Sequence, residues 1–479
     1  MERQSMALVD GKEGIIRKSA EYHPSVWGDY FIRNSSSALE KVESIQRMVK
    51  RVEELKEQVR NHLFEETHDA LQIMNLVDSI QLLGLDYHFE KEIALALRLI
   101  YEADAKNYGL YEVSLRFRLL RQHGYYLSAD VFNKFKDEKG RFLSTLNGDA
   151  KGLLNLYNAA YLGTHEETIL DEAISFTKCQ LESLLGELEQ PLASEVSLSL
   201  ETPLCRRIRR LLARKYIPIY QEYVMRNDTL LELAKLDFNL VQSLHKEEVK
   251  KISMWEPQAV DQVPEYLKDF YLKLLKTCKD FEDELEAHEK YRIPYLQEAI
   301  KVLSRSYFHE AKWGAEGYVP SLEEHLRVSL KSTGYPTVTC ASFVGLGEDA
   351  TKEAFEWVAS FPKILKSCTI ITRLMDDITS HELEQERDHV ASTVESYMKE
   401  YGTSAKVARE ELQVMVEQGW KDLNKECLGT TPVARSLIEI ILNLSRAMED
   451  IYKYKDTYTN SNTRMKDNVS LILVESFPI

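Results

Sequence analysis

The segment Arg373-Leu-Met-Asp-Asp-Ile-Thr-Ser-His-Glu-Leu-Glu384 contains the most informative spacing in the chain. Within it, Asp376, Ser380 and Glu384 follow one another at intervals of four residues. Four residues turn an α-helix by about 400°, so these three side chains share one face and span about 12 Å along it. The spacing therefore predicts a helix with oxygen atoms aligned on one side.

The chemistry of this helix face suits a divalent cation. Two carboxylates and a hydroxyl are hard oxygen ligands, and Mg²⁺ binds such groups while keeping water and phosphate oxygens in its shell. Arg373 lies one turn before Asp376 on the same side and has the planar fork that grips a phosphate. Spacing alone leaves a solvated acidic face as the alternative. The apolar residues at 370–371 and 374–375 favour the metal site, because they indicate a helix that begins in a core.

Helical patterns extend over most of the chain. It has 479 residues, too many for one core, and only 19 Gly and 12 Pro interrupt them. Between residues 88 and 101, Ile93, Leu97 and Ile100 recur at spacings of four and three, as on one face of a helix. Period-two alternation is clear only at Val196–Leu200, and we interpret it as a connection because a lone strand has no partner. The sequence predicts an all-α protein.

The helical pattern is interrupted most strongly between Pro191 and Asn227, where Pro203 and a dense basic cluster occur. We place a domain boundary in this region, with an N-terminal helical domain at residues 1–221 and a C-terminal one at 222–479. No repeat at a period of about 34 or 40 residues is visible, which argues against a helical solenoid.

A second interruption lies near residues 331–347. Gly334 and Pro336 loosen the backbone and remove a hydrogen-bond donor, so a helix should break or kink there. Two interpretations stay open on spacing alone. The segment is either a loop between two helices or an opened helix whose carbonyl groups face a cavity.

Charge argues against one class of partner. The formal net charge is −16, from 61 basic and 77 acidic residues, whereas nucleic-acid binders normally present a net basic face. We interpret the one dense basic cluster as a solvated helix face, with a polyanion site as the alternative. This basic cluster comprises Arg206, Arg207, Arg209, Arg210, Arg214 and Lys215.

The six cysteines lie far apart and form no CxxC pair, which favours reduced thiols over a disulfide frame or a zinc site. No apolar run approaches the roughly 18 residues of a membrane span. The first residues include Glu2, Asp10 and Glu13 and have no apolar core, unlike signal or transit peptides. We expect a cytoplasmic protein that binds neither membrane nor nucleic acid.

The segment DDITSHELE at 376–384 resembles the second metal motif of class I terpene synthases, (N/D)Dxx(S/T)xxxE. Residues 17–27 resemble the R(R/P)x8W motif of the same family, with Lys18 in place of the second Arg or Pro. Similar landmarks occur in family order as LRLIYEAD at 97–104, LAKLDFNLVQSLHKEE at 233–248 and YKDTYTNSNTRMKDN at 454–468. The resemblance covers nearly the whole chain.

What the resemblance implies is a sesquiterpene synthase. It implies a monomer with an N-terminal α-barrel-like domain and a C-terminal class I bundle. The enzyme would use Mg²⁺ or Mn²⁺ to ionise and cyclise farnesyl diphosphate, releasing diphosphate. The metal ligands would be Asp376, Ser380 and Glu384, and Arg373 would bind the diphosphate.

Two tyrosines resemble cavity residues of the family. Tyr335 lies at the helix break, and Tyr458 lies in the C-terminal landmark. Aromatic faces attract cations through their quadrupole, so the resemblance implies that both rings steer the carbocation. Core packing is the alternative for either side chain.

The chain departs from the family after its first C-terminal helix. An RxR motif, an aromatic-rich helix and DDxxD normally follow, but here Ser253 runs directly into Met254, and about seventy residues are missing by comparison with the motif order. Glu282–Glu286 has a DDxxE-like spacing, but this helix is not used for metal in the family. Two hypotheses follow: a synthase by descent, active or impaired, or a non-catalytic helical protein that acts through protein contact.

Overall fold

The computed structural model describes residues 30, 38–63, 69–253, 265–386 and 389–478. Regular structure within these ranges is α- or 3₁₀-helical, apart from one isolated bridge between Lys136 and Phe142. The predicted all-α class is confirmed. The motif at residues 17–27 and Met254 lie outside the described ranges. None of the described helices is long and apolar enough to cross a membrane.

The N-terminal helices pack around two apolar clusters that meet at one helix, α5. Its residues Leu115, Leu119 and Leu120 face one cluster, and Val113 and Phe117 face the other, so the helix is apolar on two sides. The helices of this part are α2 (Ala38–Leu63), α3 (Ala70–Leu82), α4 (Glu90–Glu102), α5 (Leu110–Gln122), α6 (Ala150–Ala160), α7 (Thr168–Leu184), α8 (Leu192–Glu201) and α9 (Arg209–Glu222).

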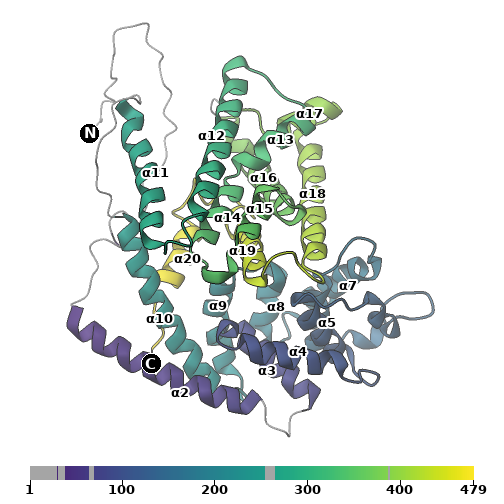
Figure 1. Ribbon diagram of the computed structural model, residues 1–479. Coiled ribbons are helices and arrows are strands. Elements are labelled where there is room, and N and C mark those ends of the chain that lie inside the picture. Colours follow the sequence, from purple (N-terminus) through teal and green to yellow (C-terminus); the bar gives the residue numbers. More distant parts are fainter. Residues whose placement is uncertain (1–29, 31–37, 64–68, 254–264, 387–388, 479) are drawn as a thin grey trace, which may run out of the picture.

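The C-terminal helices form a second bundle around α16, which contributes to both of its apolar clusters (Figure 1). Its helices are α11 (Glu265–Glu284), α12 (Arg292–Glu316), α13 (Leu322–Ser332), α14 (Tyr335–Val344), α15 (Lys352–Ala359), α16 (Lys363–Glu384), α17 (Thr393–Tyr401), α18 (Ala405–Glu426), α19 (Arg435–Ile451) and α20 (Arg464–Leu473).

Helix α10 (Asp228–Ser253) links the two bundles. The sequence boundary puts it in the second domain, yet Leu230, Leu233 and Phe238 pack in the same cluster as helices α2, α3 and α9. Phe477, close to the C-terminus, joins that cluster through an edge-on contact with Phe238. The exact boundary at 221/222 stays a prediction.

One local prediction is wrong. Val196–Leu200 is not a connection but lies inside helix α8. Val196 and Ser199 are buried and stand three residues apart, whereas Ser197 is exposed, so burial follows the helical period. The Ser199 hydroxyl accepts hydrogen bonds from Asn158 and Arg207, which allows a serine on the buried face.

The helix break at Gly334 separates two helices. α13 ends at Ser332 and α14 begins at Tyr335, with Pro336 in its first turn, where a missing N–H costs no hydrogen bond. Gly334 has φ = 79°, a left-handed conformation that other residues adopt only with strain. Of the two interpretations, a short junction between helices describes the backbone.

The basic cluster is not a solvated helix face, and that prediction is also wrong. Arg206 is 7% exposed and pairs with Glu417 of α18 at 2.6 Å. Arg209 pairs with Glu439 of α19 at 3.2 Å, and Arg214 pairs with Glu475 at 3.3 Å. The cluster therefore joins the two bundles, because these three carboxylate partners come from the C-terminal half of the chain.

Candidate functional site

The proposed metal motif occupies the last two turns of α16. The earlier turns of this helix are apolar and buried, with Leu365, Cys368 and Ile371 fully enclosed between neighbouring helices. α16 packs against α18 and α19 along this stretch. The helix thus begins in a core, as its sequence predicts, and brings its acidic end to the edge of that core.

The three motif residues on this acidic face differ in burial and in hydrogen bonding. Asp376 and Glu384 are half-buried, whereas Ser380 is 3% exposed. The Ser380 hydroxyl lies near Glu384 but makes no hydrogen bond of ordinary geometry with any described residue. A buried hydroxyl between two carboxylates without a partner is what an oxygen ligand of an absent cation would leave, so the residues fit Mg²⁺.

The carboxylates also lack a sufficient counter-charge. Burial raises the pKa of Asp376 to about 7, although Arg373 opposes this shift. Burial also raises the pKa of Glu384, and Asp377 adds to the effect. Carboxylates that are hard to ionise together favour a cation near them, because the cation removes their mutual repulsion.

Arg373 lies folded against the motif. Its guanidinium donates a hydrogen bond to Asp376, and its Nε stands 3.4 Å from Asp377 Oδ1. Burial lowers the pKa of Arg373, but Asp377 and Asp376 together raise it above its usual value. The arginine therefore remains charged and takes the position of a positive partner inside the site.

Asp377 has a structural role that spacing did not reveal. It is 3% exposed, and its Oδ2 accepts the backbone N–H of Thr393 at 2.7 Å. Thr393 is the first residue of α17. Asp377 therefore satisfies an N–H at the beginning of α17 that has no partner within the helix.

A fourth carboxylate, besides Asp376, Asp377 and Glu384, approaches the site from another helix. Glu310 of α12 accepts a hydrogen bond from Ser332 at 2.5 Å. Burial raises its pKa, whereas the charge of Arg373 lowers it. Sequence reasoning missed Glu310, because nothing in its local spacing distinguishes it from the other charged residues of an amphipathic helix.

The two predicted tyrosines have different surroundings. Tyr335 is half-buried at the start of α14, and its hydroxyl lies 3.4 Å from the sulfur of Met448. Burial raises its pKa, and Asp376 is among the charges that act on it. Tyr458 is 71% exposed, so solvent covers most of its ring. Tyr452, which was not predicted, is half-buried and also feels the charge of Asp376.

The other acidic stretch, Glu282–Glu286, does not bring candidate metal ligands together. Glu282 and Asp283 of α11 pair with Lys279 at 3.0 and 2.8 Å on the surface. Across the described residues, no three His, Cys, Asp or Glu side chains are grouped so that they could hold a metal ion. The α16 motif does not form such a group, because it has two carboxylates and a hydroxyl.

Two family models match the chain over most of its length. Residues 26–200 match the N-terminal domain of terpene synthases, and residues 245–422 match the metal binding domain of that family.

The chain belongs to the terpene synthase family.

Relatives with known names are similar over their full length. α-Humulene synthase of Zingiber zerumbet is 73% identical, with 100% of both chains covered. β-Eudesmol synthase of the same plant is 58% identical, with 99% of both covered. A solved limonene synthase with 2-fluorolinalyl diphosphate has a TM-score of 0.84 at 27% identity, covering 95% of this chain and 99% of its own.

A further solved relative contains metal. Isoprene synthase from grey poplar, in complex with three Mg²⁺ ions and dimethylallyl-S-thiolodiphosphate, has a TM-score of 0.82 at 27% identity. It covers 90% of this chain and 97% of its own. The terpene synthase fold of this chain is thus the fold of a family whose C-terminal domain binds divalent metal.

The length of these alignments bears on the missing segment. The alignment with α-humulene synthase spans 553 positions, whereas this chain has 479 residues, so at least 74 positions have no residue of this chain. This agrees in size with the segment that the motif order indicates is missing. Its location between Ser253 and Met254 stays a prediction.

Proposed function

We propose that this terpene synthase ionises and cyclises farnesyl diphosphate to a sesquiterpene and releases diphosphate, with Mg²⁺ or Mn²⁺ as cofactor. The observation that carries the proposal is the face formed by Asp376, Ser380 and Glu384. There a buried hydroxyl, which has no hydrogen bond of ordinary geometry with a described residue, lies between two half-buried carboxylates. The sesquiterpene synthases among the relatives support the substrate. Cytoplasmic location and a monomeric state remain predictions.

In this proposal the three motif residues hold the metal through their oxygen atoms, and Arg373 binds the diphosphate. When bound, the metal would neutralise negative charge on the departing diphosphate. The guanidinium of Arg373 now lies against Asp376 and Asp377. A phosphate oxygen would compete with these carboxylates for its N–H groups, so that the positive charge meets the leaving group as charge develops on it.

The neighbouring rings suit the other half of the reaction. Tyr335 and Tyr452 are half-buried, and burial together with the charge of Asp376 raises the pKa of both hydroxyls. Their faces attract positive charge and they exclude part of the water, so they would favour a carbocation held next to the diphosphate. Tyr458 is mostly exposed, and a role for it requires that another part of the molecule or the substrate covers its ring.

The missing segment limits the expected rate. In the family it carries RxR and DDxxD, which oppose the α16 motif across the diphosphate. Loss of several kcal/mol of transition-state stabilisation corresponds to a rate loss of roughly a thousandfold or more.

A second function is favoured by the same gap, namely a non-catalytic helical protein that acts through protein contact. Phe270 on α11 and Phe308 on α12 are 65% and 75% exposed, which is unusual for phenylalanine. Such side chains would suit a protein partner. The intact metal motif favours the enzyme.

A turnover assay separates these functions. The chain as written, with Mg²⁺ and farnesyl diphosphate, should release sesquiterpene very slowly or not at all, as measured by headspace gas chromatography. Insertion of a family segment with RxR and DDxxD between Ser253 and Met254 should restore cyclisation. Arg373→Ala in the restored chain should then lower turnover.

Two results would contradict this proposal. Rapid sesquiterpene release by the unmodified chain would show that one metal helix is enough for ionisation. A restored chain that folds and binds Mg²⁺ with diphosphate, but forms no product, would favour the non-catalytic function.

A further inference from the structure

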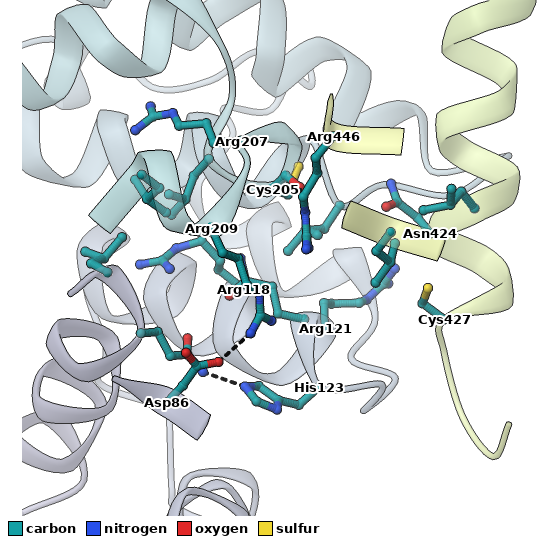
Figure 2. A pocket seen from close by; sticks show the side chains of 18 of the residues that line it. Asp86, Arg118, Arg121, His123, Cys205, Arg207, Arg209, Asn424, Cys427 and Arg446 are labelled. Carbon is teal, nitrogen blue, oxygen red and sulfur yellow. Dashed lines mark hydrogen bonds and ion pairs between the residues drawn. The ribbon is translucent and has the colours of Figure 1, made fainter. Parts of the chain in front are cut away.

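A cavity of about 80 Å³ lies where the two helical bundles meet. Its N-terminal wall is formed by α3, α5 and the segment that leads into α9, and its C-terminal wall by α18 and α19. It shares no lining residue with the metal motif of α16. Figure 2 shows Arg118, Arg209 and Arg446 gathered around this space from three different helices.

The lining of this cavity is strongly basic. It includes two aspartates, Asp78 and Asp86, and six arginines, which are Arg118, Arg121, Arg207, Arg209, Arg435 and Arg446. Two further carboxylates pair with these arginines, namely Glu167 with Arg121 and Glu439 with Arg209, Arg435 and Arg446. Six positive charges therefore face four negative ones, which leaves an excess of about two positive charges.

A neutral histidine does not alter this balance. His123 lines the cavity and hydrogen-bonds with Gln81. Burial lowers its pKa to about 4, and Arg435 and Arg209 contribute to the shift. The imidazole thus responds to the same positive field that an anion entering the cavity would meet.

Arg207 is the arginine with the least compensation. Its Nε donates to the carbonyl of Thr202 at 2.7 Å and its Nη2 to the hydroxyl of Ser199 at 2.9 Å. Within the described part of the chain no carboxylate lies within 4.0 Å of it, and burial lowers its pKa to about 10. Of the two carboxylates that act on it from farther away, Glu201 pairs with Arg464 at 2.8 Å, and burial raises the pKa of Glu195.

A second arginine in the wall is also incompletely satisfied. Arg118 is 3% exposed and binds Asp78 through both terminal nitrogens at 2.8 Å. Its Nε is buried and has no hydrogen-bond partner among the described residues. Buried donors and charges without partners are costly, so a ligand that supplies oxygen atoms here would relieve that cost.

We propose that this interdomain cavity binds a compact oxyanion of the phosphate or diphosphate class. Guanidinium forks match phosphate oxygens in geometry, and a dianion would balance the excess charge. A single buried water needs a cavity volume of roughly 10–15 Å³. The cavity of about 80 Å³ therefore has room for several waters or for one small anion. The cavity is too small to hold a prenyl chain together with the anion.

Because Arg207 and Arg118 belong to one bundle and Arg446 to the other, a bound anion bridges the domains. Ligands that bind only the folded state raise its stability, so phosphate should raise the melting temperature of the full chain. The measurement is thermal unfolding in EDTA, which excludes metal-dependent binding at α16. Phosphate is compared with NaCl at equal ionic strength. We expect a rise of at least about 3 °C with saturating phosphate.

Variants localise the effect. Arg207→Met should abolish the phosphate-dependent rise, whereas Arg141→Met, whose side chain is 72% exposed and remote from the cavity lining, should retain it. The double variant Asp376→Ala/Glu384→Ala should also retain it, so that failure of this site and failure of the metal site are distinguishable. An equal rise in Arg207→Met would overturn the assignment.

Calorimetric titration of the unaltered chain in EDTA keeps the test decisive if Arg207→Met does not fold. Saturable binding of one anion per chain is expected, and no saturable heat would overturn the proposal. Titration with phosphate and diphosphate in parallel identifies which of the two anions the cavity binds. Tighter binding of diphosphate would indicate a product of the proposed reaction, and equal or weaker binding would indicate free phosphate.

Discussion

Asp376 and Asp377 are adjacent and chemically identical, but their surroundings give them different roles. Asp376 shares a helix face with Ser380 and Glu384, whereas Asp377 is turned by about 100° and holds the first N–H of α17. The spacing of four predicts that Asp376, and not Asp377, belongs to the metal motif. What Asp377 binds depends on α17, which begins sixteen residues later in the chain.

The residue-scale prediction concerns cooperation between metal and anion. Three oxygen ligands on one helix leave about half of an octahedral shell for water and phosphate oxygens. Mg²⁺ and diphosphate titrated together by calorimetry should therefore enhance each other's binding. The double variant Asp376→Ala/Glu384→Ala should lose this enhancement.

A matched control lies on the same helix. Glu382 is exposed on another face of α16, where it pairs with Arg409 at 2.8 Å. Glu382→Ala removes one negative charge but no proposed ligand, so it should keep the mutual enhancement. Unchanged enhancement in the double variant would show that these carboxylates do not hold the metal.

At the scale of elements, the junction between α13 and α14 determines where Tyr335 stands. The turn depends on the left-handed backbone of Gly334. A Cβ added there would meet no other atom within 4 Å, so conformational strain is the main cost of a substitution.

Gly334→Ala should therefore lower the free energy of unfolding by about 1–2 kcal/mol, as measured by urea unfolding. Gly345 is the matched control, because it ends α14 with φ = −93° and also has open space around its Cα. Gly345→Ala should be nearly neutral. Equal losses in the two variants would mean that backbone strain at Gly334 is not the cause.

Helix α8 shows how an element can be misread from its sequence. Its alternation of Val, Ser and Leu fits a strand as well as a short helix. Burial of Ser199 becomes acceptable only when two side chains outside α8 donate to its hydroxyl, namely Asn158 of α6 and Arg207 of the segment before α9. The sequence pattern of α8 alone does not reveal these two hydrogen bonds.

At the scale of the whole molecule, Glu439 joins arginines on both sides of the domain interface. It lies 3.2 Å from Arg209 of α9 and 3.1 Å from Arg446 of α19. Burial would raise the pKa of Glu439, but Arg209, Arg446 and Arg435 together lower it to about 2. The ionised carboxylate thus stabilises the contact between the bundles.

The sign of the pH dependence follows from this lowered pKa. The stabilisation is present above the unfolded value of 4.5 and is lost as the pH falls from there toward 2. Glu439→Gln should lower the free energy of unfolding by about 2–3 kcal/mol at pH 7 and flatten its decline in that acidic range.

Unfolding curves between about pH 3 and pH 7 provide the measurement for this prediction. Glu410→Gln is the control, because Glu410 is exposed and its contact with Lys406 is long, at 3.9 Å. It should leave both the stability and its acid dependence nearly unchanged. A parallel acid profile in Glu439→Gln and the unaltered chain would contradict the assigned role.

The sequence by itself determined the helical class, the two-bundle division and the face shared by Asp376, Ser380 and Glu384. It could do so because the helical period places residues four apart on one side, whatever surrounds the helix. Family motifs added the expected roles and the size of the missing segment, which the alignment lengths match.

Only the tertiary structure decided the surroundings of these residues. The basic cluster resembles a solvated face until the bundles meet, because the partner of Arg206 is Glu417, 211 residues away. Glu310 approaches Arg373 from α12 for the same reason. A charge is stabilised by what lies within a few ångströms, and for these side chains that neighbourhood is made by helix packing and not by neighbours in the chain.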